Sequence, residues 1–371
     1  MTNSFYDFFA GGGMASVGLG AGWSCLLAND IDPMKSDVYR ANHPGHNFLQ
    51  GDIGALSCID LPGVADLAWA SFPCQDLSLA GAGRGLSGAR SGVFWSFERL
   101  MAQLVDDGRA PRLVALENVP GLMSSHGGRD LETAASAIAA LGYRIAMFTL
   151  DASHFTPQSR RRLFLIGIRN DLSAPVIRAT PAPRDDAEAR AARRLRNRLG
   201  TDFIDIRPPE PAPREMDLVD LVDWAAPCAE GARTAALIDL MSDVHRGRVD
   251  ERRHGGGRHV GAVYRRTRRN QDGVRVQRAE VRFDGLAGCL RTPAGGSSRQ
   301  TLILIDGGDV RSRLLTAGEA GALMGLPDSY ILPARYNDAY KLCGDGVCVP
   351  VVRYIAETIF EPILAQVSAA A

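Results

Sequence analysis

The sequence predicts an α/β fold in which a doubly wound parallel sheet is accompanied by a second, smaller domain. Over residues 1–174, short apolar segments alternate with segments of helical period, which is the pattern of parallel strands joined by crossover helices. Near residue 174 the alternation ends in PVIRATPAPRDD and IRPPEPAPRE, which are typical of linkers or loops. We therefore expect the first domain at 1–174, the second at 175–308, and a return to the first at 309–371.

Each expected element rests on a local pattern. The strands are apolar runs, most of which end near a glycine, an acid or an amide, and the helices carry apolar residues at helical spacing. Expected strands are 4–10, 24–30, 65–70, 112–118, 143–150 and 163–168, with a third strand ending at 51–53. Expected helices are 14–21, 33–42, 93–105 and 131–141. Segments 314–330 and 347–364 are also helical in pattern, and we expect both to return to the first domain.

Composition excludes several classes of protein. The 371 residues are enough for two domains and a large core. The chain has no run of eighteen apolar residues, so no membrane span is expected, and MTNSFYDFF lacks the basic start of a signal peptide. The seven cysteines are odd in number and form no C-x-x-C pair, which argues against a disulfide framework or a zinc cluster and favours a reducing, intracellular setting.

Charge is balanced over the whole chain but not along it. The formal net charge is zero, yet residues 243–299 carry fourteen arginines against six acidic residues. A genome that favours arginine codons would explain why lysine is almost absent, but it would not explain this clustering. A basic segment on a neutral protein is typical of a protein that binds a polyanion.

A glycine-rich segment, FFAGGGMASVGLG, follows the first expected strand and opens a helix. Such a loop lets a cofactor approach the N–H groups at a helix N-terminus. Gly11 and Gly13 fit the first two positions of the dinucleotide fingerprint G-x-G-x-x-G, but Ser16 occupies the third. A nicotinamide or flavin cofactor is therefore disfavoured, and a simple glycine-rich turn stays open as an alternative.

Acidic residues follow the ends of the next two strands. Asp30 and Asp32 end the second strand, where they could accept hydrogen bonds from ribose hydroxyls. Asp52 ends the third strand, where it could bind an adenine amine. Surface acids would explain each residue singly, but acids at successive strand ends favour a nucleoside site, because ligands gather at the carboxyl ends of parallel strands.

A cysteine and a glutamate follow two further strands. Cys74 lies in SFPCQDLS, before a glycine-rich loop, and Glu117 and Asn118 end the strand of LENVPGL. QSRRRLFLIG places a glutamine and three arginines before another strand. Singly, these residues are explained as a structural thiol, a strand-end cap and surface charge. Together at one edge of the sheet they favour covalent chemistry on an anionic substrate.

In their order along the chain, these motifs resemble those of DNA (cytosine-5) methyltransferases of the bacterial type. DFFAGGG resembles the family's cofactor-binding glycine motif, ND its acidic strand end and GDI its adenine contact. FPCQ resembles the catalytic Pro-Cys motif, ENV the glutamate motif and QSRRR the Gln-x-Arg-x-Arg motif. RSRLLTAGEAGALMGLPDSY and GDGVCVPVV resemble the C-terminal pair, and the arginine-rich segment falls where the family has its variable target-recognition region.

The resemblance implies a Rossmann-like methyltransferase that depends on S-adenosyl-L-methionine. Residues 1–174 and 309–371 would form the catalytic domain, and residues 175–308 the target-recognition domain. The implied reaction is site-specific methylation of cytosine C5 in double-stranded DNA, on a base flipped out of the duplex. The resemblance also implies a monomer without membrane contact, in the cytoplasm of a bacterium or encoded by a phage. It would act alone or beside a restriction endonuclease encoded elsewhere.

The resemblance assigns roles to the residues at the sheet edge. The Cys74 thiolate would add to cytosine C6, so that C5 can attack the sulfonium methyl group. Glu117 would hold a proton and give it, or a strong hydrogen bond, to cytosine N3. Asn118 would help to hold the loop, Arg162 would reach the cytosine O2, and Arg160 would support the loop.

The remaining implied contacts fall into two sets. The cofactor contacts are Phe9, Gly11, Gly13, Asp30, Ile31, Asp52, Ile53, Pro73, Val93, Asp345 and Val347. The DNA contacts are Gln75, Ser78, Arg265, Arg266, Arg268 and Arg269. No metal is implied. One departure concerns Asp345, which stands where the family's last motif has asparagine, so the cofactor geometry near this residue is an open question.

Three other functions compete with this interpretation. An RNA cytosine methyltransferase would share the core, but the region between residues 174 and 308 is large enough to read DNA. A nicotinamide-dependent oxidoreductase is disfavoured by Ser16 and leaves Cys74 without a role. A silent DNA-binding subunit would not need both Cys74 and Glu117.

Overall fold

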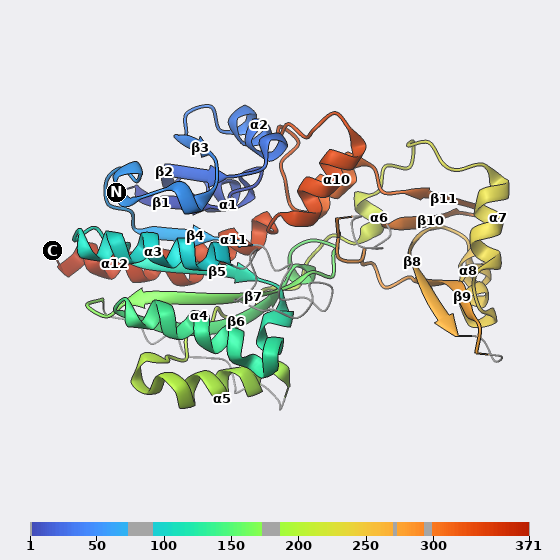
Figure 1. Ribbon diagram of the computed structural model, residues 1–371. Helices are drawn as coiled ribbons and strands as arrows, with labels where there is room; N and C mark the ends of the chain where they lie inside the picture. Colours follow the sequence, from blue (N-terminus) through green and yellow to red (C-terminus); the bar gives the residue numbers. More distant parts are fainter. Residues whose placement is uncertain (1, 73–91, 173–185, 270–272, 293–298, 371) are drawn as a thin grey trace. The chain divides into compact units, whose positions relative to one another are not determined.

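The computed structural model describes residues 2–72, 92–172, 186–269, 273–292 and 299–370, and its contacts divide the chain into two units (Figure 1). The first unit comprises Met1–Asp151, Arg161–Pro211 and Gly346–Ala371, and the second comprises Ala152–Arg160 and Ala212–Asp345. These bounds differ from the expected ones. Residues 175–211 group with the first unit, and residues 309–345, with the helical segment that begins at 314, group with the second.

A seven-stranded sheet, counted over the described residues, forms the centre of the first unit. Its strand order is β3-β2-β1-β4-β5-β7-β6, and the first five strands in this order run parallel. The reversal of order at β1, with β2 on one side and β4 on the other, is the switch point at which open α/β sheets bind ligands. The strands are β1 Asn3–Phe8, β2 Trp23–Asp30, β3 Phe48–Gln50, β4 Leu67–Ala70, β5 Leu113–Asn118, β6 Tyr143–Asp151 and β7 Arg161–Arg169.

Strand β7 departs from the expected all-parallel arrangement, because it pairs antiparallel with both β5 and β6. The segment Ala152–Arg160 between β6 and β7 contains a short 3₁₀ turn, Ala152–His154, and no crossover helix. Neighbouring strands that are joined without a crossover helix run antiparallel. The insertion of β7 beside β5 places the arginines of the QSRRR segment next to the end of the strand that carries Glu117.

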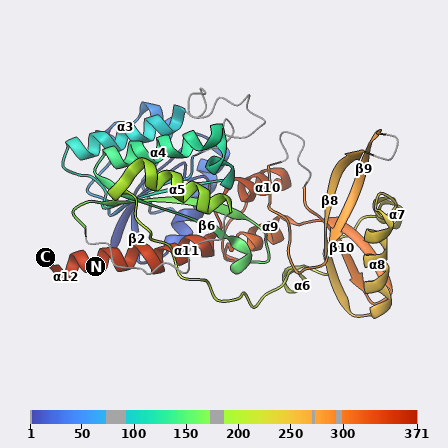
Figure 2. The ribbon, with the colours of Figure 1, turned by 90° about the horizontal axis from the view of Figure 1, so that it is seen from below.

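Helices cover both faces of this sheet, as a doubly wound fold requires. Figure 2 shows α3, α4 and α5 on one face and α11 and α12 on the other. Apolar side chains from α3 and α4 pack on the sheet, among them Phe97, Leu100 and Ile138. The helices of the first unit are α1 Met14–Leu19, α2 Pro33–Asn42, α3 Gly92–Asp106, α4 Arg129–Ala140, α5 Ala187–Leu199, α11 Val349–Ile355 and α12 Glu361–Ala370.

Helix α1 packs against α11 through a glycine. A Cβ atom at Gly18 would lie only 2.5 Å from the Cβ of Val352 and 2.8 Å from the carbonyl oxygen of Val349, so no larger residue fits there. The Arg353 guanidinium donates to the carbonyl oxygen of Leu19 at 2.7 Å. The helix that follows the glycine-rich loop is therefore supported by the last part of the chain.

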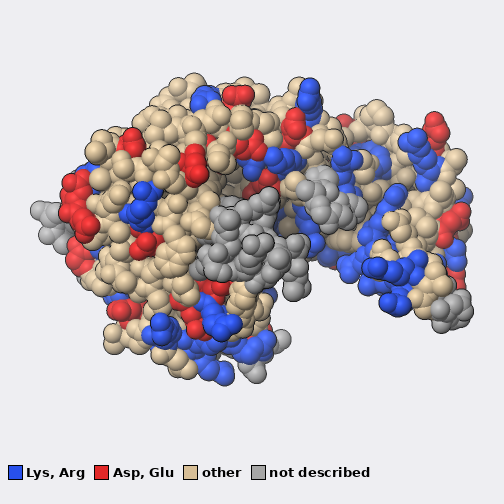
Figure 3. All heavy atoms as spheres, in the orientation of Figure 1, with Lys and Arg blue, Asp and Glu red and all other residues tan. Residues whose placement is uncertain are grey.

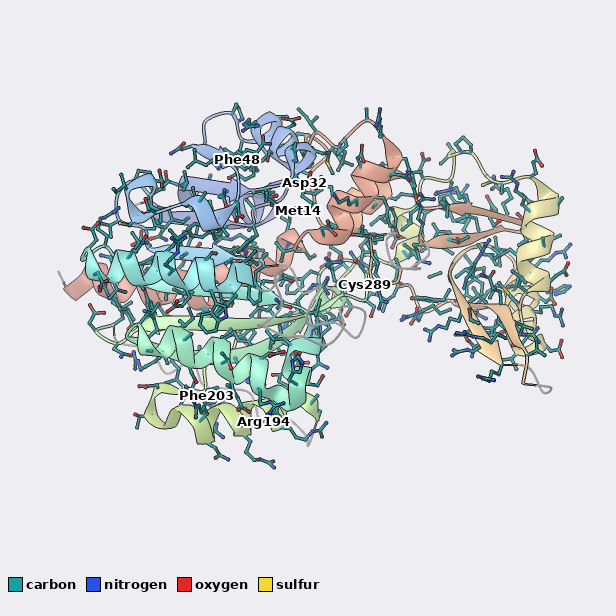
Figure 4. All side chains as sticks on the ribbon, in the orientation of Figure 1. Met14, Asp32, Phe48, Arg194, Phe203 and Cys289 are labelled. Atoms are coloured by element: carbon teal, nitrogen blue, oxygen red, sulfur yellow. The ribbon has the colours of Figure 1, made fainter. Side chains whose placement is uncertain are left out.

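Helix α5 was not expected from the sequence, which predicts loops and a new domain in this region. Asp186 caps its first turn by accepting from the N–H of Ala189 at 3.0 Å. Arg194 of α5 pairs with Glu132 of α4 at 3.2 Å, and Arg196 lies over the ring of Phe203 (Figure 4). These contacts hold α5 in the first unit, although its sequence is rich in arginine.

The second unit is built on a four-stranded antiparallel sheet, counted over the described residues, in the order β11-β10-β8-β9. Apolar side chains of α7, α8 and the sheet form its core, including Leu237, Val249 and Ile303. Its strands are β8 Arg258–Arg269, β9 Arg275–Arg282, β10 Thr301–Asp306 and β11 Asp309–Leu314. Its helices are α6 Leu218–Leu221, α7 Gly231–Asp239, α8 Asp243–Gly255, α9 Ala317–Leu323 and α10 Tyr336–Asp345.

Candidate active site

The loop between β1 and α1 needs glycine at two positions. Gly11 and Gly13 have φ angles of 58° and 82°, which lie in the left-handed region that favours glycine. A Cβ atom at Gly13 would also lie 2.4 Å from Nε2 of His43 and 2.9 Å from the ring of Tyr39. A side chain at residue 13 would therefore require the loop or the rings of His43 and Tyr39 to move.

Asp30 fixes this loop from the neighbouring strand. The N–H of Gly11 donates to Asp30 Oδ2 at 2.8 Å, and the N–H of Asp32 donates to Asp30 Oδ1 at 2.8 Å. Asp32 in turn caps α2 by accepting from the N–H groups of Met34 and Lys35 (Figure 4). Both carboxylates expected to meet a ribose thus bind the main chain, and each oxygen can accept a further hydrogen bond.

The other expected cofactor residues differ in how they are placed. Ile31 is 65% exposed directly after Asp30, although it is a large apolar residue. Asp52 is exposed and accepts from the N–H of Gly54 at 2.8 Å through one oxygen. An exposed apolar side chain and a carboxylate suit the ring and the amine of an adenine. Phe9 and Val93 are half-buried, Ile53 and Val347 are buried, and Pro73 lies outside the described residues.

Asp7 is a buried acid under the same loop that was not among the residues expected from the sequence. The Ser16 hydroxyl donates to Asp7 Oδ2 at 2.9 Å and lies 3.0 Å from the hydroxyl of Tyr39, which lies 3.0 Å from Nδ1 of His46. Burial raises the pKa of Asp7 to about 7; the Ser16 hydrogen bond opposes this shift and the charge of Asp30 adds to it. A lone acid inside the apolar strand SFYDFFA was the signal that could have identified it.

Asp7→Asn is expected to flatten the pH dependence of stability. Since folding raises the pKa of Asp7 from 3.8 to about 7, the protonated side chain stabilises the fold fully below about pH 4, and this contribution is lost as pH rises to about 7. Asparagine cannot ionise, so the free energy of unfolding should shift in favour of the variant by about 1.4 kcal/mol per pH unit over this window. Urea unfolding of both proteins across the window measures the shift, and a difference that stays constant with pH would contradict it.

Glu117 and Arg162 form an ion pair at the ends of β5 and β7. Arg162 Nε lies 3.0 Å from Glu117 Oε1, and the two side chains are 14% and 9% exposed. Because water is largely excluded, the pair is held more firmly than a surface pair. Asn118 donates from Nδ2 to the carbonyl oxygen of Phe72 at 3.2 Å, while its Oδ1 accepts from the N–H of Val119.

The segment that carries the expected nucleophile begins directly after Phe72. Cys74, Gln75 and Ser78 lie outside the described residues, so their expected roles stay predictions. Asn118 nevertheless ties the end of β5 to the last described residue before this segment. The structure thus brings three expected site residues, Glu117, Asn118 and Arg162, to one end of the sheet in the first unit.

Arg160 and Asp345 belong to the second unit. Arg160 is buried, and it donates to the carbonyl oxygens of Leu290 and Gly344, both at 3.0 Å, with Nη1 also 3.4 Å from Sγ of Cys289, which Figure 4 labels. Arg160 therefore joins two segments of chain. Asp345 is exposed at the end of α10 and accepts a hydrogen bond from the Thr292 hydroxyl.

The four arginines that were expected to contact DNA lie on β8, where basic side chains gather over β8 and β9 (Figure 3). Arg266 and Arg268 pair with Glu280 of β9. Arg265 is exposed, and Arg269 donates to the carbonyl oxygen of Gly273 at 3.1 Å. Together they give the second unit a strongly basic surface.

Some kinds of site are absent from the part of the chain that the structure describes. No group of three or more histidine, cysteine, aspartate or glutamate residues there could hold a metal ion. The six cysteines within it are free. None of its helices has the length and hydropathy needed to cross a membrane.

Comparison with known proteins identifies the family of the chain. A family model described as C-5 cytosine-specific DNA methylase matches residues 3–361, which is nearly the whole chain. The chain is 27% identical over 358 residues to the type II methyltransferase M.NlaX of Neisseria lactamica, covering 95% of this chain and 94% of the relative. It is 26% identical over 357 residues to the type II methyltransferase M.HhaI of Haemophilus parahaemolyticus, covering 96% and 93%.

Solved structures resemble the fold over the same length. A Spodoptera frugiperda DNMT2 variant matches with a TM-score of 0.62 and 18% identity, covering 96% of this chain and 99% of that one. An Escherichia coli protein described as a putative DNA modification methyltransferase encoded within a prophage matches with a TM-score of 0.59 and 17% identity, covering 98% and 99%. At such identities the match shows a shared fold, which agrees with the Rossmann-like arrangement of the first unit.

Proposed function

The chain belongs to the C-5 cytosine-specific DNA methylase family, and on this premise we propose that it transfers a methyl group from S-adenosyl-L-methionine to C5 of a flipped-out cytosine. Membership of the family makes it an enzyme that methylates cytosine in DNA. What we propose is the identity of the methyl donor and the role of each site residue. The observation that supports these roles most strongly is the buried Glu117–Arg162 pair, beside Asn118, which holds the chain that leads into Cys74.

Cys74 is the proposed nucleophile. Its thiolate adds to C6 of the flipped cytosine, and the electron pair of the C5–C6 double bond then makes C5 nucleophilic. After methylation at C5, a base removes the C5 proton. The C6–S bond then breaks, which releases the Cys74 thiolate and forms 5-methylcytosine. Asn118 positions this nucleophile through its hydrogen bond to the carbonyl oxygen of Phe72, two residues earlier.

Glu117 and Arg162 stabilise the ring while Cys74 is attached. Addition at C6 places negative charge on N3 and O2, which needs a proton or hydrogen bonds. Glu117 donates to N3, and Arg162 donates to O2 from the guanidinium N–H groups that Glu117 does not occupy. Glu117 is ion-paired in the structure, so a proton must reach its carboxyl group before it can donate.

The residues at the β1–α1 loop fit S-adenosyl-L-methionine, which supplies an electrophilic methyl group when bound. Ile31 offers an exposed apolar face, Asp52 has a carboxylate oxygen that can accept from an amine, and Asp30 can accept from a ribose. Gly13 is held against α2 with no room for a side chain, which keeps the N-terminus of α1 accessible. These residues bind and orient the donor.

The second unit is the proposed target-recognition domain, because its β8–β9 surface is basic and can bind the phosphates of double-stranded DNA. Arg160 acts inside this unit, where it fixes the segments 289–290 and 344. The relatives named type II methyltransferases suggest a role in restriction–modification, with a cognate endonuclease encoded elsewhere. We propose that the enzyme acts as a monomer in the cytoplasm.

Bisulfite sequencing of DNA from cells that express the protein tests the proposed function. Protected cytosines should occur within one short sequence motif, whereas the motif should be unprotected in cells without the gene. Transfer of tritiated methyl groups from S-adenosyl-L-methionine to DNA, but not to a pool of transfer RNA, would separate a DNA enzyme from an RNA enzyme. Incorporation of the label into transfer RNA but not into DNA would overturn the proposal.

Asp345→Asn is expected to change cofactor affinity less than tenfold, below about 1.4 kcal/mol. Asp345 is exposed and already accepts from the Thr292 hydroxyl, so a neutral side chain of the same shape can keep this contact. Calorimetric titration of both proteins with S-adenosyl-L-methionine at several pH values measures the effect. A much larger change, or one that varies with pH only in the aspartate form, would mean that this acid touches the cofactor.

A further inference from the structure

The arginines of β8 point to opposite faces of the second unit's sheet. Successive side chains of a strand alternate between faces, and directly paired residues share a face. Tyr264 pairs with Glu280 and Arg266 pairs with Arg278, so these four side chains lie on one face, and Arg268 joins them. Arg265 and Arg269, which alternate with these residues along β8, lie on the other face. The four arginines of the RRTRR segment therefore form two different sets.

Glu280 orders the first set. It accepts from Nε and Nη2 of Arg268 at 2.9 and 2.6 Å, and its second oxygen lies 3.2 Å from Nε of Arg266. The Arg268 guanidinium is held along one edge and that of Arg266 at its Nε, so the remaining N–H groups of both are presented in a restricted direction. Both side chains stay about half exposed, so these outer edges are open to a ligand.

Tyr264 links this pair to a third arginine. The ring of Tyr264 lies under the guanidinium of Arg266, 5.7 Å from its centre, and the Tyr264 hydroxyl accepts from Nη1 of Arg282 at 3.3 Å. Nε of Arg282 donates to both oxygens of Asp284 at 2.7 and 2.8 Å. Three guanidinium groups are thus fixed in a row by two carboxylates and a tyrosine.

Two adjoining clefts open along this row. One has a volume of about 350 Å³ and is lined by Arg266 and Arg282, and the other has a volume of about 440 Å³ and is lined by Arg268 and Arg278. Glu280, which holds the arginines, and His245 line both clefts, so the clefts adjoin at these two residues. Among the residues described, neither cleft is lined by Arg265 or Arg269.

Arginines with and without a carboxylate partner suit different parts of DNA. An arginine reads guanine by donating two parallel hydrogen bonds to O6 and N7, which requires a guanidinium of fixed direction. A phosphate contact needs charge more than direction, and an ion-paired arginine has little net charge to offer. Arg265 has no carboxylate partner among the described residues, so its full charge is available.

We propose that Arg266, Arg268 and Arg282 read base edges of the target sequence, that Glu280 and Asp284 are their positioning residues, and that Arg265 and Arg269 contact phosphates only. This inference rests on the proposed role of the second unit in DNA recognition. It assigns sequence specificity to one face of the β8–β9 ribbon and salt-dependent affinity to the other.

Matched arginine substitutions separate these two contributions. The preferred sequence of each variant is found by selecting bound duplexes from a random library, which does not depend on methyl transfer. Arg266→Gln and Arg268→Gln should each lower discrimination against a changed base pair by roughly tenfold to a hundredfold. Arg265→Gln should keep the preferred sequence and lower the slope of log affinity against log salt by about one. Arg311→Gln, on β11, is the control that should alter neither quantity.

Glu280→Gln is the decisive variant for positioning. It removes a negative charge and releases Arg266 and Arg268, so binding to unrelated DNA should become tighter while the sequence preference weakens. Partial unfolding would weaken both, and a thermal melt checks that the variant is folded. Unchanged selectivity in Arg266→Gln and Arg268→Gln, or relaxed selectivity in Arg265→Gln, would overturn the inference. Absence of protected cytosines in the wild-type bisulfite assay would instead overturn the proposed function.

Discussion

Cys74→Ala is expected to abolish methyl transfer, with turnover lowered by about four orders of magnitude or more. The reason is that loss of the catalytic nucleophile removes the covalent route. Alanine has no group that can add to C6, so C5 stays too weak a nucleophile to accept the methyl group. Cofactor and DNA binding should be nearly unchanged. Incorporation of tritiated methyl groups into DNA measures turnover.

A mechanism-based trap and a matched variant complete this test. Fluorine at C5 cannot leave as a proton does, so DNA that contains 5-fluorocytosine should trap the wild type as a covalent adduct. Cys58→Ala removes another free, half-buried thiol of the first unit and should leave both turnover and trapping intact. A Cys74→Ala protein with near-native turnover, or a wild type that never forms the adduct, would refute the covalent mechanism.

Glu117→Gln is expected to lower kcat by about 10²- to 10⁴-fold, which is the usual contribution of a general acid or base. Glutamine has the same size and can still accept from Arg162, but it cannot transfer a proton to N3. The Michaelis constant for DNA should change far less than kcat, because the base is bound by other groups. Single-turnover kinetics separate the chemical step from product release.

Glu188 offers a control for the structural part of this effect. It is also a buried glutamate of the first unit, and it pairs with Arg161 at 3.2 Å and Arg207 at 3.5 Å. Both Glu117→Gln and Glu188→Gln leave arginines without a charged partner, so both should lower the free energy of unfolding. Only Glu117→Gln should lower kcat; an equal loss of kcat in Glu188→Gln would mean that the effect is structural.

Local signals in the sequence predicted the order of elements in the first unit. The bounds of α2 agree with the expected 33–42, because Asp32 and Pro33 form a cap and a first turn that are visible in the sequence. Pairing between distant strands leaves no such local signal, and the antiparallel course of β7 was not predicted. Helix α5 was missed because only one large apolar side chain, Leu195, lies on its buried face, beside Glu188, Ala191 and Ala192.

The candidate site was predictable as a set of residues but not as a set of contacts. The motifs indicated Glu117 and Arg162, while their ion pair depends on β7 lying beside β5. Asp30 was expected to meet a ligand, and the structure adds that it holds Gly11. The division of Arg265 from Arg266 depends on β8 being a strand, whose successive side chains point to opposite faces, and a basic segment alone does not reveal this.

The contact between α1 and α11 has a consequence for how the protein is made. Leu19 and Arg353 are 334 positions apart, so the contact between α1 and α11 cannot form while most of the chain is still being synthesised on the ribosome. A nascent chain can form β1, its glycine loop and the contacts of Ser16 with Asp7 and Tyr39, but α1 gains its support from α11 only after Arg353 has left the exit tunnel. The contact behind the glycine-rich loop is therefore completed only once α11 has been made, and a chain terminated before α11 would carry the site motifs without this support of α1.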